Sequence, residues 1–235
     1  MIKEIFKESR ESYGSPRITE ELKKQGIRCN KKRIARLMRK AGISAKIYRK
    51  YRITTMSDHN RERSENILGR EFVRGGPNEV WTSDITYIRT DEGWLYLAAV
   101  MDLYSRKIVG WELEKRLDSD LVEKALQSAL YDRKVEEGII FHSDQGVQYT
   151  SESFRRLLKA NGFIQSMSRR GNCYDNAVTE SFFHTLKTEL INRTKYRTRA
   201  EARRSIFEYI EIFYNRKRIH STLGYLTPVE YEKVT

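Results

Sequence analysis

The chain has 235 residues, enough for one well-buried core with small additional modules. It carries 45 Lys and Arg against 32 Asp and Glu, a net charge of +13, which indicates a polyanionic partner. Two widely separated cysteines, no apolar run of about 20 residues and no signal peptide argue against a disulfide-rich secreted domain and against a membrane protein, so we expect a cytoplasmic protein.

The charge is distributed unevenly along the chain. Residues 1–77 have a net charge of +12, residues 78–144 a net charge of −6 and residues 145–235 a net charge of +7. An acidic centre between two basic ends is typical of a core that holds metal ions and is flanked by surfaces that bind phosphate. Solvated helix faces give similar counts, and that alternative stays open for any single Lys or Arg.

The first 45 residues predict three short helices. Apolar side chains recur at helical spacing in residues 2–11 and 18–25, with a break around Pro16 and a stop at Gly26. Asn30 is suited to cap a third helix. A tight turn followed by a basic helix is typical of a helix-turn-helix module, so we expect DNA contacts here, with inert packing as the alternative. The basic residues of the third helix are Lys31, Lys32, Arg33, Arg36, Arg39 and Lys40.

Residues 46–77 are polar and basic, show no periodicity and end in Gly75-Gly76-Pro77. This composition predicts a linker. Its arginines either follow a nucleic-acid backbone or are simply solvated.

The central part of the chain alternates between strand-like and helix-like runs. β-Branched and aromatic residues predict strands, and apolar residues at helical spacing predict helices. We expect the order βββαβαβα, which predicts an α/β (α+β) fold with a mixed five-stranded sheet and flanking helices. The expected strands are residues 80–88, 94–103, 108–113, 139–144 and 163–167, and the expected helices are a helix capped by Asp118 and residues 151–160 and 175–192.

Three acidic residues occur at informative places in this order. Asp84 lies within the first strand, Asp144 closes the fourth, and Glu180 lies in the last of these helices, with 35 residues between it and Asp144. A carboxylate inside a strand is costly to bury unless it is paired or binds a metal. Three carboxylates on two strands and one helix can converge on two Mg²⁺ ions. For Asp102 and Asp175 we expect structural roles, the latter as a helix cap together with the neighbouring amide.

The tail, residues 196–235, predicts a helical extension. Thr198 and Glu201 form a capping-box pattern, and the helix that follows is expected to run to about residue 216. Residues 214–220 are basic with an interleaved aromatic side chain. They either bind phosphate or pack the tail on the core.

Several stretches resemble a known group of proteins. The strand order with its three acids resembles the ribonuclease H-like fold, and the 35-residue gap resembles the D,D-35-E pattern of retroviral integrases and insertion-sequence transposases. Together the stretches resemble the second-reading-frame (OrfB) transposases of the IS-three family over nearly the whole chain. They are WTSDITY (81–87), DLYSRKIVGW (102–111), HSDQGVQY (142–149), GNCYDNAVTESFF (171–183), and the tail residues Tyr214, Asn215, Arg218, His220, Leu223, Gly224 and Pro228.

The resemblance implies a domain plan and an activity. It implies a helix-turn-helix-like module (1–45), a basic linker (46–77), a DDE integrase catalytic core (78–195) and a basic helical extension (196–235). It also implies that Asp84, Asp144 and Glu180 are catalytic and bind two Mg²⁺ ions, for which Mn²⁺ substitutes. The expected reaction is 3′-end cleavage and strand transfer of an insertion sequence by a copy-out, paste-in route.

The resemblance further implies DNA contacts and partners. Lys187 stands seven residues after Glu180, where the family places a Lys or Arg against transposon-end DNA. We expect transposon-end and target DNA as substrates, at least a dimer on DNA, an upstream-frame protein or frameshift fusion as partner, no membrane, and a place on the nucleoid in the bacterial cytoplasm. The other expected DNA contacts are Arg169, Arg170, Asn172, Lys32, Arg33, Arg36 and Arg218.

Two other functions remain alternatives from the sequence. A metal-dependent nuclease of the same fold would cut DNA without joining it. A non-catalytic regulator would use the basic head alone and would not need the three acids.

Overall fold

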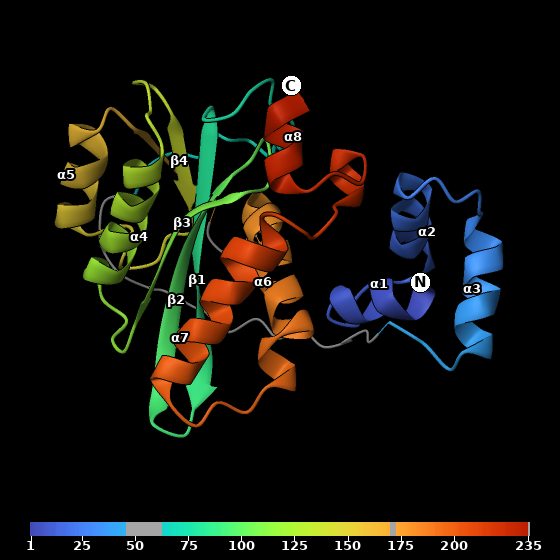
Figure 1. Ribbon diagram of the computed structural model, residues 1–235. Helices are drawn as coiled ribbons and strands as arrows, with labels where there is room; N and C mark the ends of the chain where they lie inside the picture. Colours follow the sequence, from blue (N-terminus) through green and yellow to red (C-terminus); the bar gives the residue numbers. More distant parts are fainter. Residues whose placement is uncertain (46–62, 170–172, 235) are drawn as a thin grey trace.

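The computed structural model describes residues 1–45, 63–169 and 173–234 (Figure 1). Residues 46–62 of the expected linker lie outside these ranges, as do Arg170 and Asn172. A small helical head, coloured blue in Figure 1, lies beside a larger body built on one sheet.

The head contains the three expected helices, α1 (Ile2–Glu8), α2 (Ser15–Lys24) and α3 (Lys31–Lys40). Asn30 caps α3 as predicted, since its side-chain oxygen accepts a hydrogen bond from the Arg33 amide at 2.8 Å. α2 starts at Ser15, three residues earlier than expected. Pro16 lies in its first turn, where a missing N–H breaks no helical bond, so the proline begins this helix instead of separating it from α1.

The body contains a mixed five-stranded sheet with the order β3-β2-β1-β4-β5, which confirms the predicted fold class. β1 (Val80–Thr90), β2 (Gly93–Asp102) and β3 (Ile108–Glu114) form the expected antiparallel meander. β4 (Ile140–Ser143) pairs parallel to β1, and β5 (Ile164–Met167) pairs parallel to β4. Parallel neighbours need crossover connections, and the intervening helices provide them.

Helices cover both faces of the sheet (Figure 1). α4 (Ser119–Asp132) and α5 (Glu152–Ala160) cover one face, and α6 (Ala177–Glu189) and α7 (Arg199–Phe207) cover the other. Asp118 is the N-cap residue of α4, as expected, but its side chain makes no capping hydrogen bond. A short α8 (Pro228–Val234) ends the described chain. In the described ranges no helix has both the length and the apolar character that a membrane crossing requires.

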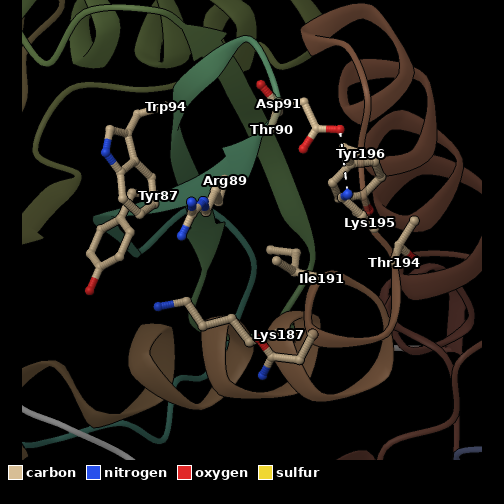
Figure 2. A pocket seen from close by; sticks show the side chains of 11 residues that line it. Tyr87, Arg89, Thr90, Asp91, Trp94, Lys187, Ile191, Thr194, Lys195 and Tyr196 are labelled. Carbon is tan, nitrogen blue, oxygen red and sulfur yellow. Dashed lines mark ion pairs between the residues drawn. The ribbon is translucent and has the colours of Figure 1, made fainter.

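β1 extends well beyond its partner β4. The pairing covers Val80 to Thr82, and an isolated bridge joins Thr90 to Tyr196 at the far end of the strand. Between these points the outer edge of β1 has no strand partner among the described residues. Figure 2 shows the far end of this edge, where Tyr87 and Thr90 face the α6 side chain of Lys187 and the segment with Tyr196.

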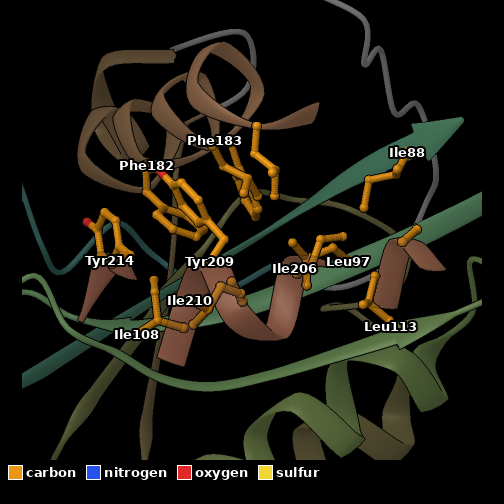
Figure 3. Close-up of a cluster of buried hydrophobic side chains, with 14 of the residues drawn as sticks. Ile88, Leu97, Ile108, Leu113, Phe182, Phe183, Ile206, Tyr209, Ile210 and Tyr214 are labelled. Carbon is orange, nitrogen blue, oxygen red and sulfur yellow. The ribbon is translucent and has the colours of Figure 1, made fainter. Parts of the chain in front are cut away.

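The main core lies between the sheet and the helices α6 and α7 (Figure 3). After α7 the chain continues as a π-helical stretch, Glu208–Tyr214, in place of the expected regular helix. In a π-helix each carbonyl is hydrogen bonded to the amide five residues further on, and the turn is wider than in an α-helix. Residues four and five apart therefore lie on the same side of the helix. The buried residues of this stretch fit that spacing: Tyr209, Ile210, Phe213 and Tyr214.

On the opposite face, α4 packs directly against β3 at Gly110. A Cβ atom added to Gly110 would lie 2.4 Å from the carbonyl oxygen of Ala125 and 2.5 Å from the amide of Ala129. Only glycine permits this approach of helix backbone to strand.

The tail packs against the head. The Tyr13 hydroxyl accepts a hydrogen bond from the Ile219 amide at 2.8 Å and donates one to the Lys217 carbonyl at 3.3 Å. Ile219 is buried in the apolar cluster of the head helices. Arg193, after α6, donates to the Arg10 carbonyl at 3.0 Å. The head is therefore attached to the body by both backbone bonds and apolar contacts.

Arg218 lies inside this junction and not on the surface. Its guanidinium donates to both carboxylate oxygens of Glu189, at distances of 2.9 to 3.1 Å, and the Tyr209 hydroxyl donates to the same carboxylate at 2.7 Å. Arg218 is 5% exposed and Glu189 is 7% exposed. Of the two roles left open for the basic tail segment, packing is the one that Arg218 has in this structure.

Replacing Arg218 with Met should lower the free energy of unfolding by about 3–5 kcal/mol, because Glu189 would keep a buried charge without its partner. Urea denaturation followed by circular dichroism measures this. Arg216→Met, at an exposed neighbouring position, is the matched control and should change stability little. Adding Glu189→Leu to Arg218→Met should recover stability; a single variant as stable as wild type would contradict the buried pair.

A buried carboxylate, Asp175, fixes the start of α6. It accepts hydrogen bonds from the side chains of Asn66 at 2.9 Å, Arg70 at 2.8 Å and Arg169 at 3.2 Å, and from the Arg169 amide at 3.1 Å. The expected capping role is therefore wrong. Nearby, Leu68 is buried, so this part of the expected linker packs on the body. Burial raises the pKa of Asp175, but the bonds from the two arginines outweigh it and hold the pKa well below its usual value.

The lowered pKa predicts a pH-dependent contribution to stability. A carboxyl whose pKa is lower in the folded state stabilises the fold at pH values above its unfolded pKa of 3.8, and this contribution declines as the pH falls below that value. We expect Asp175→Asn to lose about 1–2 kcal/mol at pH 7, since the partner arginines are partly exposed and screened. The difference in the free energy of unfolding between Asp175→Asn and wild type should shrink below about pH 4.

Urea unfolding at pH 7 and pH 3 tests this expectation. Glu152→Gln serves as the control, because Glu152 is an exposed carboxylate on α5 with one i,i+4 partner. If the free energies of unfolding of wild type and Asp175→Asn differed by the same amount at both pH values, the assignment of Asp175 as an ionised carboxylate would be contradicted.

Candidate active site

The pairing of β1 with β4 brings two of the three predicted acids together. The last paired residues are Thr82 and His142, and Asp84 and Asp144 each stand two positions further along their strands. Because side chains alternate along a strand, residues two positions on point the same way as the paired residues. The parallel register therefore directs both carboxylates to one edge of the sheet.

The first turn of α6 lies over the same place and carries Glu180. The Thr179 hydroxyl donates to the Thr82 hydroxyl at 2.7 Å, and the Asn176 side-chain amide donates to the Ser83 carbonyl at 3.3 Å. These two bonds attach the helix to β1 immediately before Asp84. Glu180 follows Thr179 directly, so the third acid belongs to the same site.

The charges of the three acids act on one another. Burial raises the pKa of Asp84 well above its usual value, and the negative charges of Asp144 and Glu180 raise it further. Burial and the charge of Asp144 likewise raise the pKa of Glu180. The buried Tyr149, whose hydroxyl bonds with Ser83 at 2.8 Å, has its pKa raised by burial and by the charges of Asp84 and Asp144. The triad is one electrostatic unit.

Backbone amides engage two of the carboxylates. The Ile85 amide donates to Asp84 at 2.7 Å, and the Gly146 amide donates to Asp144 at 2.9 Å. A Cβ at Gly146 would lie 2.9 Å from Asp144 Oδ1, so a larger residue there would displace this carboxylate. Within residues 1–45, 63–169 and 173–234, no three His, Cys, Asp or Glu side chains form a ready-made metal cluster.

The donor set nevertheless fits hard divalent cations. All three groups are carboxylates, which are preferred ligands of Mg²⁺ and Mn²⁺. Their mutual repulsion, seen in the raised pKa of Asp84, is the situation that a bound cation relieves. A metal-binding role for the triad stays a prediction that the chemistry of the donors supports.

The remaining predicted residues fall into separate groups. Lys187 lies on α6 two turns after Glu180, and its ammonium group is 4.9 Å from the centre of the Tyr87 ring. Arg169 is largely exposed and is bonded to Asp175. Lys32, Arg33 and Arg36 are exposed on α3 in the head, away from the triad. Arg218 is buried, as described above, and Arg170 and Asn172 lie outside the described residues.

The sequence reasoning missed two groups near the site. His142, beside Asp144, is fully buried between the hydroxyls of Ser166 and Ser168, at 2.9 and 3.0 Å. Burial lowers its pKa to about 4, so the ring is neutral at pH 7 and holds β4 to β5. The other group is the exposed aromatic pair Tyr87 and Trp94. Exposed aromatics beside a basic residue are a signal that the strand pattern alone could have given.

Asp102 has the structural role that the sequence predicts. It is fully buried, accepts backbone bonds from Asn78 and Tyr104, both at 2.8 Å, and pairs with Arg133 at 3.0 Å. It therefore holds the end of β2 and is not part of the triad.

Comparison with known proteins agrees with this geometry. The integrase core domain model matches residues 75–173 and, as a second model, residues 180–235, and an HTH-like domain model matches residues 1–51. The chain is 45% identical over 227 residues to the transposase InsF for insertion sequence IS3A of Escherichia coli K12, covering 97% of this chain and 79% of the relative. It is 44% identical to an uncharacterised 31 kDa protein of insertion element IS600 from Shigella sonnei, covering 96% and 83%.

Among solved structures, the chain resembles one in a simian T-cell lymphotropic virus intasome, in complex with the PP2A regulatory subunit B56 gamma, with a TM-score of 0.56. The identity is 14%, and the match covers 94% of this chain and 70% of the other. This likeness supports the fold alone. With the sequence relatives and the matched domains, it follows that the chain belongs to the IS3-type insertion-sequence transposases, which are DDE enzymes built on an integrase core domain.

Proposed function

We propose that this transposase cleaves the 3′ ends of its insertion sequence and joins them to target DNA, with Asp84, Asp144 and Glu180 as its catalytic residues. The observation that carries the proposal is the parallel register of β1 and β4, which directs Asp84 and Asp144 to the same edge under the first turn of α6. The copy-out, paste-in route is part of the proposal and rests on family resemblance.

In this proposal the three carboxylates hold two Mg²⁺ ions, with Mn²⁺ as a substitute. Bound there, the cations supply Lewis-acid stabilisation of negative charge on the reacting phosphate. The attacking groups are water for cleavage and the freed 3′-hydroxyl for joining, so no side chain becomes covalently attached to DNA. The protein's part is to fix the carboxylates, which β1, the turn at Gly146 and the attached α6 do.

The DNA partners are held by cations at two places. Lys187, beside Tyr87 at the open edge of β1, is positioned to contact a transposon-end phosphate. On the head, the exposed α3 residues Lys32, Arg33 and Arg36 provide a second basic surface. Arg169, Arg170 and Asn172 remain proposed DNA contacts. We further propose at least a dimer on DNA and cooperation with an upstream-frame protein or frameshift fusion.

A nuclease without strand transfer is the second candidate, because the same triad would also cut DNA. Incubating the protein with pre-cleaved transposon ends, a plasmid target and Mg²⁺ separates the two. A transposase yields joined product, whereas a nuclease yields only shortened or nicked DNA. The family match favours the transposase.

Asp144→Asn and Glu180→Gln should each reduce both cleavage and joining by about a thousandfold or more, since each removes several kcal/mol of stabilisation from the reacting phosphate. Their affinity for duplex DNA should stay close to wild type. Gel-based assays measure cleavage and joining, and fluorescence anisotropy measures the affinity for duplex DNA. Glu152→Gln, on exposed α5, should keep full activity. Variants that fold and still cleave would refute the assignment.

Calorimetric titration with Mn²⁺ tests the proposed ligands without relying on activity. Wild type should show a saturable heat of binding that Asp84→Ala loses, because Asp84 is the buried carboxylate on which the charges of both Asp144 and Glu180 act. Glu152→Ala should titrate like wild type. The same heat for Asp84→Ala and wild type would place the cation elsewhere.

A further inference from the structure

A polar pocket of about 540 Å³ lies at the outer end of the β1–β2 hairpin (Figure 2). Its walls come from both strands of the hairpin, from the end of α6 and from the segment that leads to α7. A volume of this size is typical of sites that take a single small molecule or one large group of a polymer. The three acids of the proposed catalytic site are not among its lining residues.

Two aromatic rings form one wall. Tyr87 on β1 and Trp94 on β2 meet edge to face with their centres 5.4 Å apart, and they remain 40% and 46% exposed. Aromatic side chains are usually buried in the core, and most rings of this chain are. An adjacent exposed pair at the mouth of a pocket offers flat apolar surface to a planar ligand.

The rest of the lining is cationic. Arg89 and Lys187 lie on the same side of Tyr87 in Figure 2, and the Lys187 ammonium lies 4.9 Å from the centre of the tyrosine ring. Among the described residues that line the pocket, the acidic one is Asp91, and its carboxylate pairs with the Lys195 ammonium at 3.8 Å. The lining therefore keeps an excess of positive charge beside its aromatic wall. Cations next to exposed rings are the usual equipment for holding a single nucleic-acid strand.

An open strand edge connects this pocket with the catalytic residues. On the edge of β1 that faces away from β2, no strand pairs with it among the described residues from Asp84 until the bridge at Thr90. Asp84 and Tyr87 are three residues apart, about 10 Å along an extended strand. Their side chains leave opposite faces of β1, so a DNA strand that reaches both passes around this open edge.

We propose that this pocket seats one unpaired nucleotide of the DNA end, a short distance along the strand from the reacting phosphate, by stacking its base on Trp94 and Tyr87. Arg89 and Lys187 bind the adjacent phosphates. The pocket is too small for a duplex, and its aromatic wall can act only on a base released from pairing. This proposal rests on the proposed function, because it takes the transposon end as the strand at Asp84.

Binding by two DNA forms tests the proposal. One is a blunt duplex of the transposon end, and the other is the same duplex with the last few bases of one strand left unpaired. Measured by fluorescence anisotropy without divalent cation, Trp94→Ala should bind the frayed duplex about tenfold more weakly than wild type does, which is the effect of losing one stacked base. Its affinity for the blunt duplex should not change.

Matched variants separate stacking from structure. Trp94→Phe keeps an aromatic ring and should retain most of the preference for the frayed duplex. Tyr131→Ala removes a tyrosine that is 92% exposed on α4 and does not line the pocket, so this variant should bind both DNA forms like wild type. Circular dichroism confirms that each variant is folded. Equal effects of Trp94→Ala on both duplexes, or no effect on either, would overturn the proposal.

A position-specific readout comes from 2-aminopurine placed at successive unpaired positions. Its fluorescence should be quenched at a single position near the reacting phosphate, and Trp94→Ala should remove that quenching. Quenching that is uniform along the strand would contradict a single seat. Strand transfer by wild type on the frayed duplex is measured in parallel. If wild type fails to join ends, the proposed function fails; if it joins ends but shows no stacking position, only this inference fails.

Discussion

The parallel pairing of β1 with β4 covers only three residue pairs, and the geometry of the acids depends on it. It ends at Thr82 and His142, so Asp84 and Asp144 follow together just where the pairing stops. A slip of one residue in this register would turn one carboxylate to the opposite face of the sheet. The buried neighbours on both strands, Trp81 and Phe141, oppose such a slip because they would leave the core.

Three kinds of contact hold α6 in place above this edge. Its first turn is hydrogen bonded to β1 through Thr179, and the preceding turn is held by the buried charge of Asp175. Phe182 and Phe183 pack into the core between sheet and tail, as Figure 3 shows. Apolar burial supplies most of the stabilisation, and the polar bonds fix the orientation of the helix. A group on this helix is therefore held as firmly as one on the sheet.

The tail connects the head with the body. Arg218 and Glu189 form a buried ion pair where α6 ends, and the neighbouring Ile219 reaches the apolar cluster of the head. Exposed positive charge is present on α3, at Arg169 and at the hairpin pocket, among other places on the surface. Positive charge is thus found on both sides of the carboxylates, and this arrangement suits a polyanion that extends past them.

The sequence by itself determined the order of strands and helices, the cap at Asn30 and the three acids, because these follow from local periodicity, local capping chemistry and the spacing of motifs. It could not determine which charges are buried. Asp175 looked like a cap and Arg218 like a phosphate contact, yet their partners stand far away in the chain: Arg70 lies 105 residues from Asp175, and Glu189 lies 29 residues from Arg218. Tertiary structure also decided that Tyr87 and Trp94 remain exposed beside Lys187. The physical reason is that burial and charge pairing depend on which distant segments meet, and residue type alone does not specify that.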